Sequence, residues 1–332
     1  MEAATVYSVG RAEVRVPART ALVGNPSDGF GGMVVSLALE ELGTSVVAEP
    51  ALAVTLEADG EELRFADLGA LVAAGRERAY PAGGPLALLM AAAIRFAAPQ
   101  PRLCESGVSL RVADSSIPPG VGLAGSSAIV IGALQALGRL FGAEVSEAGL
   151  PGLALACERD ELGIEAGLQD RVVQTYGGLL FMDFSAGPDE CRVEPLDADR
   201  LPTLFVAWLP GTASDSGAVH AEVRKRHDAG DARVRKTMRE IAALARRALR
   251  PLMTGDAAEL GLLMKRNLEL RGQIYDLDPR HLELAQAAGS LGLPANYTGS
   301  GGAIVGLFSR EDQIADLREA LATLDAELLI RR

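Results

Sequence analysis

A glycine-rich loop that runs into a helix is the stretch of this sequence best suited to chemistry. Residues 117–130 read IPPGVGLAGSSAIV, with two prolines, three glycines and two adjacent serines before an apolar run. Glycines let a backbone approach a phosphate closely, and the first N–H groups of a helix lack intrahelical acceptors. They also carry the positive end of the helix dipole, and serines there can cap the helix or bind a phosphate-bound metal ion. The loop therefore predicts a phosphate site.

The loop departs from a Walker P-loop at one position. Gly120 and Gly125 have the Walker spacing, but Ser126 stands where the P-loop has its lysine. The chain has only three lysines, Lys225, Lys236 and Lys265. We therefore expect backbone amides, serines and Mg²⁺ to hold the phosphates. On the loop alone, an ordinary glycine-rich turn with a serine cap explains the pattern about as well.

Composition and charge restrict the class of protein and ligand. The 332 residues are 48% hydrophobic and 23% charged, as in a globular protein. No apolar run reaches the length of a membrane span, and the first fourteen residues lack a signal-peptide pattern, so we expect a cytoplasmic protein. A net charge of −12 argues against nucleic acid or an anionic membrane as partner. An anionic ligand would need local arginines.

Cysteine and histidine usage predicts neither disulfides nor a zinc site. The three cysteines share no CxxC spacing, and the three histidines form no HxxxH or HExxH pattern. These residues are Cys104, Cys157, Cys191, His220, His227 and His281.

The elements expected around the loop are mixed strands and helices. Strands are expected at 1–16, 16–24, 33–40, 44–50, 52–58, 108–114, 179–184, 203–210, 303–308 and the C-terminus. Helices are expected at 84–98, 129–141, 150–162, 214–250, 255–275, 279–290 and before the last strand. Residues 163–178 form a glycine-punctuated segment, and the polar stretch 185–202 is the best boundary. This order indicates α+β architecture in two lobes.

Three further segments carry residues suited to phosphoryl transfer. Residues 17–28 place Arg19 after Pro-Ala and Asp28 nine residues later. Residues 156–178 place Glu158 and then Asp170, twelve residues on, before paired glycines, and residues 298–303 read TGSGGA. Taken singly, Arg19 is most simply an arginine on a strand, Glu158 a solvated helix residue and Asp170 a loop acid. A turn between helix and strand likewise explains the last segment.

Together, the four segments resemble the galactokinase–homoserine kinase–mevalonate kinase–phosphomevalonate kinase (GHMP) superfamily. Its central motif is P-x-x-x-G-L-x-S-S-A, and Gly125 here lengthens the Gly-Leu-x-Ser-Ser spacing by one residue. The matching residues are Pro118, Gly122, Leu123, Ser126, Ser127 and Ala128. Because the four matches stand in the right order over nearly the whole chain, the protein is identified as a member.

The resemblance implies a two-lobed α+β fold. Residues 1–190 would form a nucleotide-binding and catalytic domain of ribosomal-protein-like α/β type, and residues 191–332 a ferredoxin-like α+β domain. The cofactors would be ATP and Mg²⁺, with Ser127 and Glu158 as the metal ligands. Asp170 would be the general base, with Arg19 beside it. The nucleotide would contact Pro118, Gly120, Gly122, Leu123, Ala124, Gly125, Ser126, Ser127 and Ala128.

Within the superfamily, the chain looks like the glucuronokinases, which make glucuronate 1-phosphate from glucuronate and ATP. The likeness rests on GNPSD at 24–28, where galactokinases have an E-H-T-D loop, on 158–184 and on SDSGAVHAEVR at 214–224. An aspartate base favours a sugar or mevalonate kinase over homoserine kinase. The residues expected to meet the sugar acid are Asn25, Asp28, Arg171, Arg224, Gly299 and Gly301.

Other readings remain open at this point. Another sugar 1-kinase, acting on galactose, arabinose or a heptose, fits the same motifs, and mevalonate kinase fits them less well. A catalytically silent sugar sensor on the same fold is the alternative from a different class. We expect a small-molecule substrate, no nucleic acid or membrane partner, and a monomer or homodimer.

Overall fold

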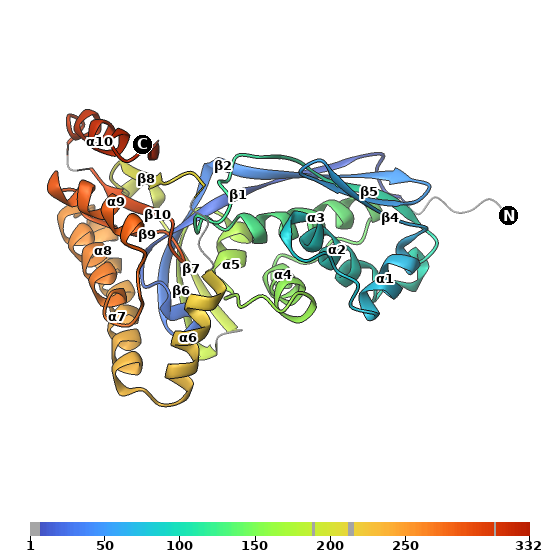
Figure 1. Ribbon diagram of the computed structural model, residues 1–332, viewed down its shortest axis with the longest axis horizontal. Helices are drawn as coiled ribbons and strands as arrows, with labels where there is room; N and C mark the ends of the chain where they lie inside the picture. The colour runs from blue at the N-terminus through green and yellow to red at the C-terminus, as the bar shows by residue number, and fades with distance from the viewer. Residues whose placement is uncertain (1–6, 188–189, 212–215, 309) are drawn as a thin grey trace.

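The computed structural model describes residues 7–187, 190–211, 216–308 and 310–332, and it has two lobes (Figure 1). The larger lobe contains a seven-stranded sheet with helices packed against it, and the smaller lobe contains a four-stranded sheet. One cluster of buried apolar side chains runs through both lobes. This confirms the predicted two-lobed α+β architecture. Among the described residues, no helix is both long and apolar enough to cross a bilayer.

The larger sheet is built around one long strand, β2. The seven strands are β1 (Ala12–Val23), β2 (Met33–Ala51), β3 (Val54–Ala58), β4 (Glu61–Phe65), β5 (Gly107–Ser115), β6 (Leu179–Gly187) and β7 (Glu190–Leu196). Their order is β4-β3-β5-β2-β6-β7, with β1 against β2. The second half of β2 lies between β1 and β5, and its first half lies between β1 and β6. The strand therefore connects the two ends of the lobe.

Two strand boundaries expected from the sequence are wrong. The separate strands expected at 1–16 and 16–24 form a single strand, β1, although residues 1–6 lie outside the described part of the chain. Pro17, which has no N–H to donate, sits at a shift in the β1–β2 register. The segments 33–40 and 44–50 likewise join as β2, because Gly43 bonds Ser116 and keeps the chain extended.

Within its described residues, the larger lobe has two longer helices, α2 and α3, and three short ones. They are α1 (Leu68–Arg76), α2 (Gly84–Ala97), α3 (Gly125–Phe141), α4 (Leu150–Ala156) and α5 (Gln169–Tyr176), with a π-turn at Cys157–Glu161. The sequence did not predict α1 or α5, and the helix expected at 150–162 divides into α4 and the π-turn. Short helices carry too few turns for a clear apolar period.

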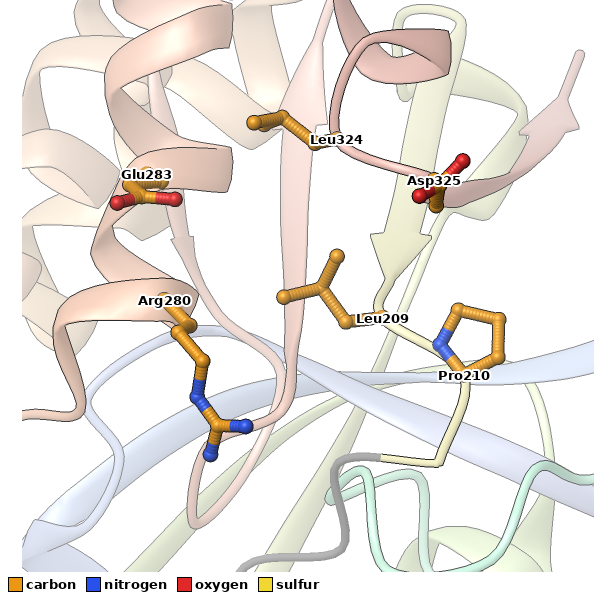
Figure 2. Close-up of a pocket in the computed structure, with 6 residues that line it drawn as sticks. All are labelled: Leu209, Pro210, Arg280, Glu283, Leu324 and Asp325. Atoms are coloured by element: carbon orange, nitrogen blue, oxygen red, sulfur yellow. The ribbon is translucent and has the colours of Figure 1, made fainter.

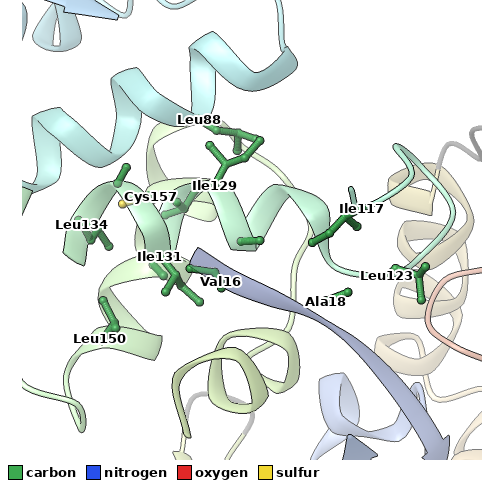
Figure 3. Packing of buried hydrophobic residues seen from close by; sticks show 14 of the residues in the cluster. Val16, Ala18, Leu88, Ile117, Leu123, Ile129, Ile131, Leu134, Leu150 and Cys157 are labelled. Carbon is green, nitrogen blue, oxygen red and sulfur yellow. The ribbon is translucent and has the colours of Figure 1, made fainter. Parts of the chain in front are cut away.

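Helix α3 is held by a dense apolar core. Figure 3 shows Ile129, Ile131 and Leu134 of α3 among the buried side chains packed near Val16 of β1. Leu123, in the glycine loop, belongs to the same cluster and is 1% exposed. Packing on both sides of the loop–helix junction therefore fixes where the loop ends.

The smaller lobe has the predicted ferredoxin-like pattern. Its strands are β8 (Leu204–Trp208), β9 (Ala295–Tyr297), β10 (Ala303–Leu307) and β11 (Glu327–Arg331), antiparallel in the order β11-β8-β10-β9. Its helices are α6 (Ser216–Asp228), α7 (Ala232–Thr254), α8 (Ala257–Arg271), α9 (Pro279–Ser290) and α10 (Gln313–Ala322). Taking α6–α9 as one helical block, the chain runs β-α-β-β-α-β.

One helix expected in this lobe is two. The expected helix 214–250 is broken between α6 and α7, where Gly230 has a φ of 88° and the Asp231 side chain accepts hydrogen bonds from the first N–H groups of α7. An aspartate cap starts a new helix there. Residues 212–215, which include the first two residues of the 214–224 segment, lie outside the described part of the chain.

The larger sheet extends past the expected domain boundary. Strand β7 pairs with β6, and the next strand along the chain, β8, belongs to the smaller sheet. The change of sheet therefore falls between residues 196 and 204, at the end of the polar stretch 185–202. The division after residue 190 stays a prediction, and a division at 197–203 would follow the sheets more closely.

Candidate active site

An arginine and an aspartate from distant parts of the chain form the centre of the site. Arg19 lies on β1 and is 5% exposed, and Asp170 lies in the first turn of α5. Arg19 Nε and Nη2 each lie 2.6 Å from Asp170 Oδ1. Arg19 Nη1 donates to the carbonyl oxygens of Gly122 and Thr298, both at 2.8 Å. One guanidinium therefore joins β1, α5, the glycine loop and the C-terminal lobe.

The glycine loop and the 298–302 segment meet backbone to backbone. A Cβ on Gly122, whose φ is 77°, would lie 2.7 Å from Gly301 O, and a Cβ on Gly299 would lie 2.5 Å from Gly122 O. Thr298 Oγ1 also donates to Gly122 O at 3.1 Å. Glycine is required at these positions because a side chain would separate the two loops. The contact brings both predicted glycine segments to the Arg19–Asp170 pair.

Helix α3 begins without the serine cap expected from the sequence. The N-cap is Ala124 in the left-handed region, with a φ of 65°, and no side chain caps the helix. The first helical bond runs from Ala128 N to Ala124 O, so the three preceding N–H groups have no intrahelical acceptor. Ser126 is exposed, whereas Ser127 is buried. The junction keeps the amide-rich geometry of an anion site even though alanine replaces the cap.

Glu158 and Arg171 form a buried ion pair beside this centre. The π-turn after α4 carries Glu158, which is fully buried, and Arg171 Nη2 contacts its Oε2. Arg171 Nη1 donates to Gly167 O at 2.8 Å and lies 3.7 Å from Asp170 Oδ2. Burial and the charge of Arg19 lower the pKa of Arg171 to about 9. Arg171 therefore faces two carboxylates of the protein, where the sequence suggested a substrate carboxylate.

Asp28 is a second buried acid near the Arg19–Asp170 pair. It lies in the short 3₁₀ turn Ser27–Phe30 and is 8% exposed. A Cβ on Gly167 would lie 2.7 Å from Asp28 Oδ2, so this carboxylate packs against the segment that leads into α5. Burial and the charge of Asp170 raise the pKa of Asp28 from 3.8 to about 6, although Arg19 opposes the change.

Asn25 and Arg224, which were also predicted to contact the substrate, hold the loop that carries Asp28 in place. Asn25 is buried, and its Nδ2 donates to Tyr297 O at 3.1 Å and to Gly299 O at 3.4 Å. Arg224 donates to Gly29 O at 2.5 Å and stacks 4.4 Å from the centre of the Phe30 ring. Contact of either side chain with a sugar stays a prediction.

Family models match both lobes of the chain. The model described as GHMP kinases N terminal domain matches residues 87–178, and the one described as GHMP kinases C terminal matches residues 235–325. The chain belongs to the GHMP kinases. This confirms the membership inferred from the four sequence segments.

Relatives of this GHMP kinase cover most of its length. "Glucuronokinase 1" of Arabidopsis thaliana is 33% identical over 306 residues, 88% of this chain and 84% of the relative. "Probable glucuronokinase 2" of the same plant is 36% identical over 315 residues, 88% and 83% of the two chains. The crystal structure of Methanococcus jannaschii mevalonate kinase superposes with a TM-score of 0.79 at 18% identity over 97% of this chain and 98% of that one. That structural likeness shows a shared fold.

Two residues that hold the kinase site together through long-range contacts were not predicted from the sequence. Arg271 is fully buried, donates to Gly299 O at 2.7 Å and Ser300 O at 3.2 Å, and lies near the rings of Tyr275 and Tyr297. Burial lowers its pKa. Gln174, one turn after Asp170 on α5, bonds the glycine loop. No local motif marks either residue, because their partners lie far away in the sequence.

Two surface pockets lie apart from the Arg19–Asp170 pair. One of about 260 Å³ is shown in Figure 2, and none of its six lining residues is a predicted site residue. Its Arg280 is paired with Asp278 at 2.7 Å. The other, of about 240 Å³, touches Ser27 and Phe30 on the turn that carries Asp28. We therefore place the active site at the Arg19–Asp170 pair and its polar neighbours rather than in either pocket.

Replacing Asp28 by asparagine is expected to stabilise the fold while weakening the site. The pKa of Asp28 is about 6 in the fold against an ordinary 3.8, so folding favours its protonated form. The free energy of unfolding therefore falls as pH rises from about 4 to 6, and asparagine avoids that loss. We expect Asp28→Asn to gain roughly 3 kcal/mol in urea unfolding at pH 8 and nothing below pH 4.

Asp278→Asn provides a control of opposite sign. The side-chain hydrogen bond from Arg280 lowers the pKa of Asp278 to about 2, so its ionised form stabilises the fold above that pH. This variant should lose stability at pH 8. An Asp28→Asn protein no more stable than the wild type at pH 8 would contradict the burial of an ionised Asp28.

Proposed function

We propose that this GHMP kinase transfers the terminal phosphoryl group of ATP to the anomeric hydroxyl of D-glucuronate, giving glucuronate 1-phosphate. The observation that carries the proposal is the 33–36% identity to two plant proteins named as glucuronokinases over 88% of the chain. The contact between Arg19 and Asp170 and the nearby Glu158–Arg171 pair supply the residues that such a reaction needs.

Asp170 is suited to accept the proton of the acceptor hydroxyl. Both contacts from Arg19 fall on Oδ1, so Oδ2, which lies 3.7 Å from Arg171 Nη1, is the oxygen for a substrate. The guanidinium stabilises the carboxylate, which is the form that can take up a proton. An anomeric hydroxyl is more acidic than other sugar hydroxyls, so a carboxylate of modest basicity suffices. Arg19 also offers positive charge beside the transferring phosphoryl group.

The chain fits a magnesium ion with few protein ligands. Ser127 Oγ lies 2.6 Å from Gln174 Oε1 and 3.2 Å from Ala124 O, and both of these partners are acceptors. A hydroxyl has one proton, so the lone pairs of Ser127 Oγ are not used by these partners. Apart from its ion contact with Arg171, neither oxygen of Glu158 has a hydrogen bond within the described residues.

Ser127 and Glu158 would hold the magnesium ion, which would neutralise negative charge on the phosphates. Mg²⁺ usually takes only one or two ligands from the protein. Among the described residues, no three histidine, cysteine or acidic side chains gather in one group. The amides at the start of α3 would bind phosphate oxygens. A cytoplasmic location and a monomeric or dimeric state are also part of the proposal.

Two observations favour this function over the alternatives. The long matches to proteins named as glucuronokinases speak against galactose, arabinose, heptose or mevalonate as the preferred acceptor. A silent sensor has no need of an intact base, yet Asp170 is present and held in contact with Arg19. Release of ADP with none of a panel of sugars, together with sugar binding, would identify a sensor.

Glucuronate is expected to react at least about a hundredfold better than glucose in kcat/KM. A uronate carboxylate must leave water and meet a guanidinium in a chain whose net charge is −12. A neutral sugar would leave that cation without its partner, at a cost of a few kcal/mol, or about a hundredfold. The measurement is a coupled assay of ADP release with glucuronate, galacturonate, glucose, galactose, arabinose and mevalonate.

Arg224 is the better placed of the two arginines suggested for the carboxylate. It is partly buried over the Asp28 turn, whereas Arg171 is occupied by Glu158. Arg224→Ala should therefore reduce the preference for glucuronate and leave ATP binding unchanged. Arg247→Ala, which removes an exposed arginine of α7, is the matched control. If the wild-type enzyme turned over glucose and glucuronate at equal rates, the proposed preference for a uronate would be refuted, but the proposed kinase activity would stand.

A further inference from the structure

Helix α5 presents two polar side chains from one face. Asp170 and Gln174 are four residues apart, and side chains at that spacing lie one above the other on a helix. Asp170 contacts Arg19, whereas Gln174 points to the loop–α3 junction and is 6% exposed. The helix that carries the base is therefore also in contact with the phosphate loop.

The Gln174 side chain forms hydrogen bonds with three segments. Its Nε2 donates to Pro17 O on β1 at 2.9 Å and to Ala124 O at 2.8 Å. Its Oε1 accepts from Ser127 Oγ at 2.6 Å. Two N–H groups on two carbonyl oxygens fix the orientation of the amide, so its oxygen must face Ser127. Gln174 thus ties the strand of Arg19, the end of the loop and the first turn of α3 to α5.

The junction that Gln174 holds is conformationally costly. Ala124 has a φ of 65°, a left-handed conformation that is strained for a residue with a Cβ. Its carbonyl oxygen accepts from Ala128 N and Gln174 Nε2, and Ser127 Oγ lies 3.2 Å from it. The shorter contact of the Ser127 hydroxyl, to Gln174, directs its proton toward α5. The lone pairs of Ser127 are then free to face a ligand.

We infer that Gln174 is a positioning residue that sets the distance between the phosphate site and the base. It acts through Ser127 and Ala124 and touches neither substrate. Phosphoryl transfer depends on the placement of donor and acceptor, and a displacement of about 1 Å can cost about a hundredfold in rate. The inference rests on the proposed kinase function but does not depend on which sugar is the acceptor.

The test compares Gln174→Met with Gln169→Ala. Methionine fills the volume of glutamine and removes all three hydrogen bonds. Gln169 is a buried glutamine on the same helix, and it donates to Ser36 Oγ on β2 at 2.7 Å. We expect Gln174→Met to weaken Mg-ATP binding by about tenfold in calorimetry without sugar, and to lower kcat by about tenfold or more. The KM for sugar should stay within about twofold of the wild type.

Gln169→Ala should lower Tm by a similar amount and leave Mg-ATP binding and kcat within about twofold. Ser127→Ala and the double variant Ser127→Ala/Gln174→Met complete a cycle. If Gln174 acts through Ser127, the double variant should bind Mg-ATP about as the worse single variant does. If Gln174→Met is too unstable to assay, Gln174→Leu, which also removes all three hydrogen bonds, can replace it in both the single and the double variant.

Two results would overturn the inference, and they differ from failure of the proposed function. Gln174→Met with wild-type Mg-ATP affinity and kcat, and only a lower Tm, would make Gln174 purely structural. Additive losses in the Ser127 cycle would show that it does not act through that hydroxyl. A wild-type protein that binds no Mg-ATP would instead refute the kinase function, and with it the role of Gln174.

Discussion

Asp170→Asn is expected to lower kcat by at least about a hundredfold while the protein stays folded. Asparagine keeps the shape of the side chain and can still accept from Arg19, which contacts a single oxygen, Oδ1. The amide nitrogen that replaces Oδ2 cannot take up the proton of an acceptor hydroxyl. The loss should therefore appear in kcat, with the affinity for Mg-ATP and the Tm close to those of the wild type. Steady-state kinetics with saturating ATP measure the effect.

Asp160→Asn is the matched control for this prediction. Asp160 is an exposed acid after α4 that pairs with Arg95 at 3.1 Å. The variant therefore removes one carboxylate charge, as Asp170→Asn does, but outside the site. Its kcat should stay within about twofold of the wild type, because surface ion pairs contribute little. Turnover by Asp170→Asn within a few-fold of the wild type would make Asp170 a structural acid and would require another base.

The residues proposed for the site came from a family resemblance in which each lies in a short motif. Arg19, Ser127, Glu158 and Asp170 were identified because four such motifs stand in the family's order, and the structure brings Arg19 and Asp170 into contact across 151 residues. The ferredoxin-like lobe was implied by the family resemblance, and its strands were expected as short apolar runs bounded by turns. Local pattern and chain order carried that part of the interpretation.

The rest depends on contacts that no local pattern records. Gln174 and Arg271 donate hydrogen bonds to backbone carbonyl groups of other segments. Every residue has a backbone carbonyl group, so the amino-acid sequence does not indicate which one accepts the bond. The serine cap that the sequence allowed does not form, because the N-cap is Ala124 in a left-handed conformation, and its carbonyl oxygen accepts from Ala128 N and Gln174 Nε2. Arg171 was assigned to a substrate carboxylate, and only the fold shows Glu158 against it.

Arg19→Lys is expected to lower kcat/KM by at least about a hundredfold at a small cost in stability. A lysine keeps the charge, but its single nitrogen cannot contact Asp170 Oδ1 from two sides and also reach Gly122 O and Thr298 O. Both carbonyl groups keep another donor, Thr298 Oγ1 for Gly122 and Ala21 N for Thr298. The fold should therefore survive, and the loss should fall on the orientation of the base.

Pairing the two substitutions separates orientation of the base from an independent role of Arg19. If Arg19 acts chiefly by holding Asp170, Arg19→Lys/Asp170→Asn should be within a few-fold of Asp170→Asn alone, because residues that act as a unit are not additive. Arg15→Lys, on an exposed arginine of the same strand, should change kcat/KM by less than about twofold. Losses that multiply in the double variant would mean that the guanidinium acts on the transferring phosphoryl group itself, independently of the base.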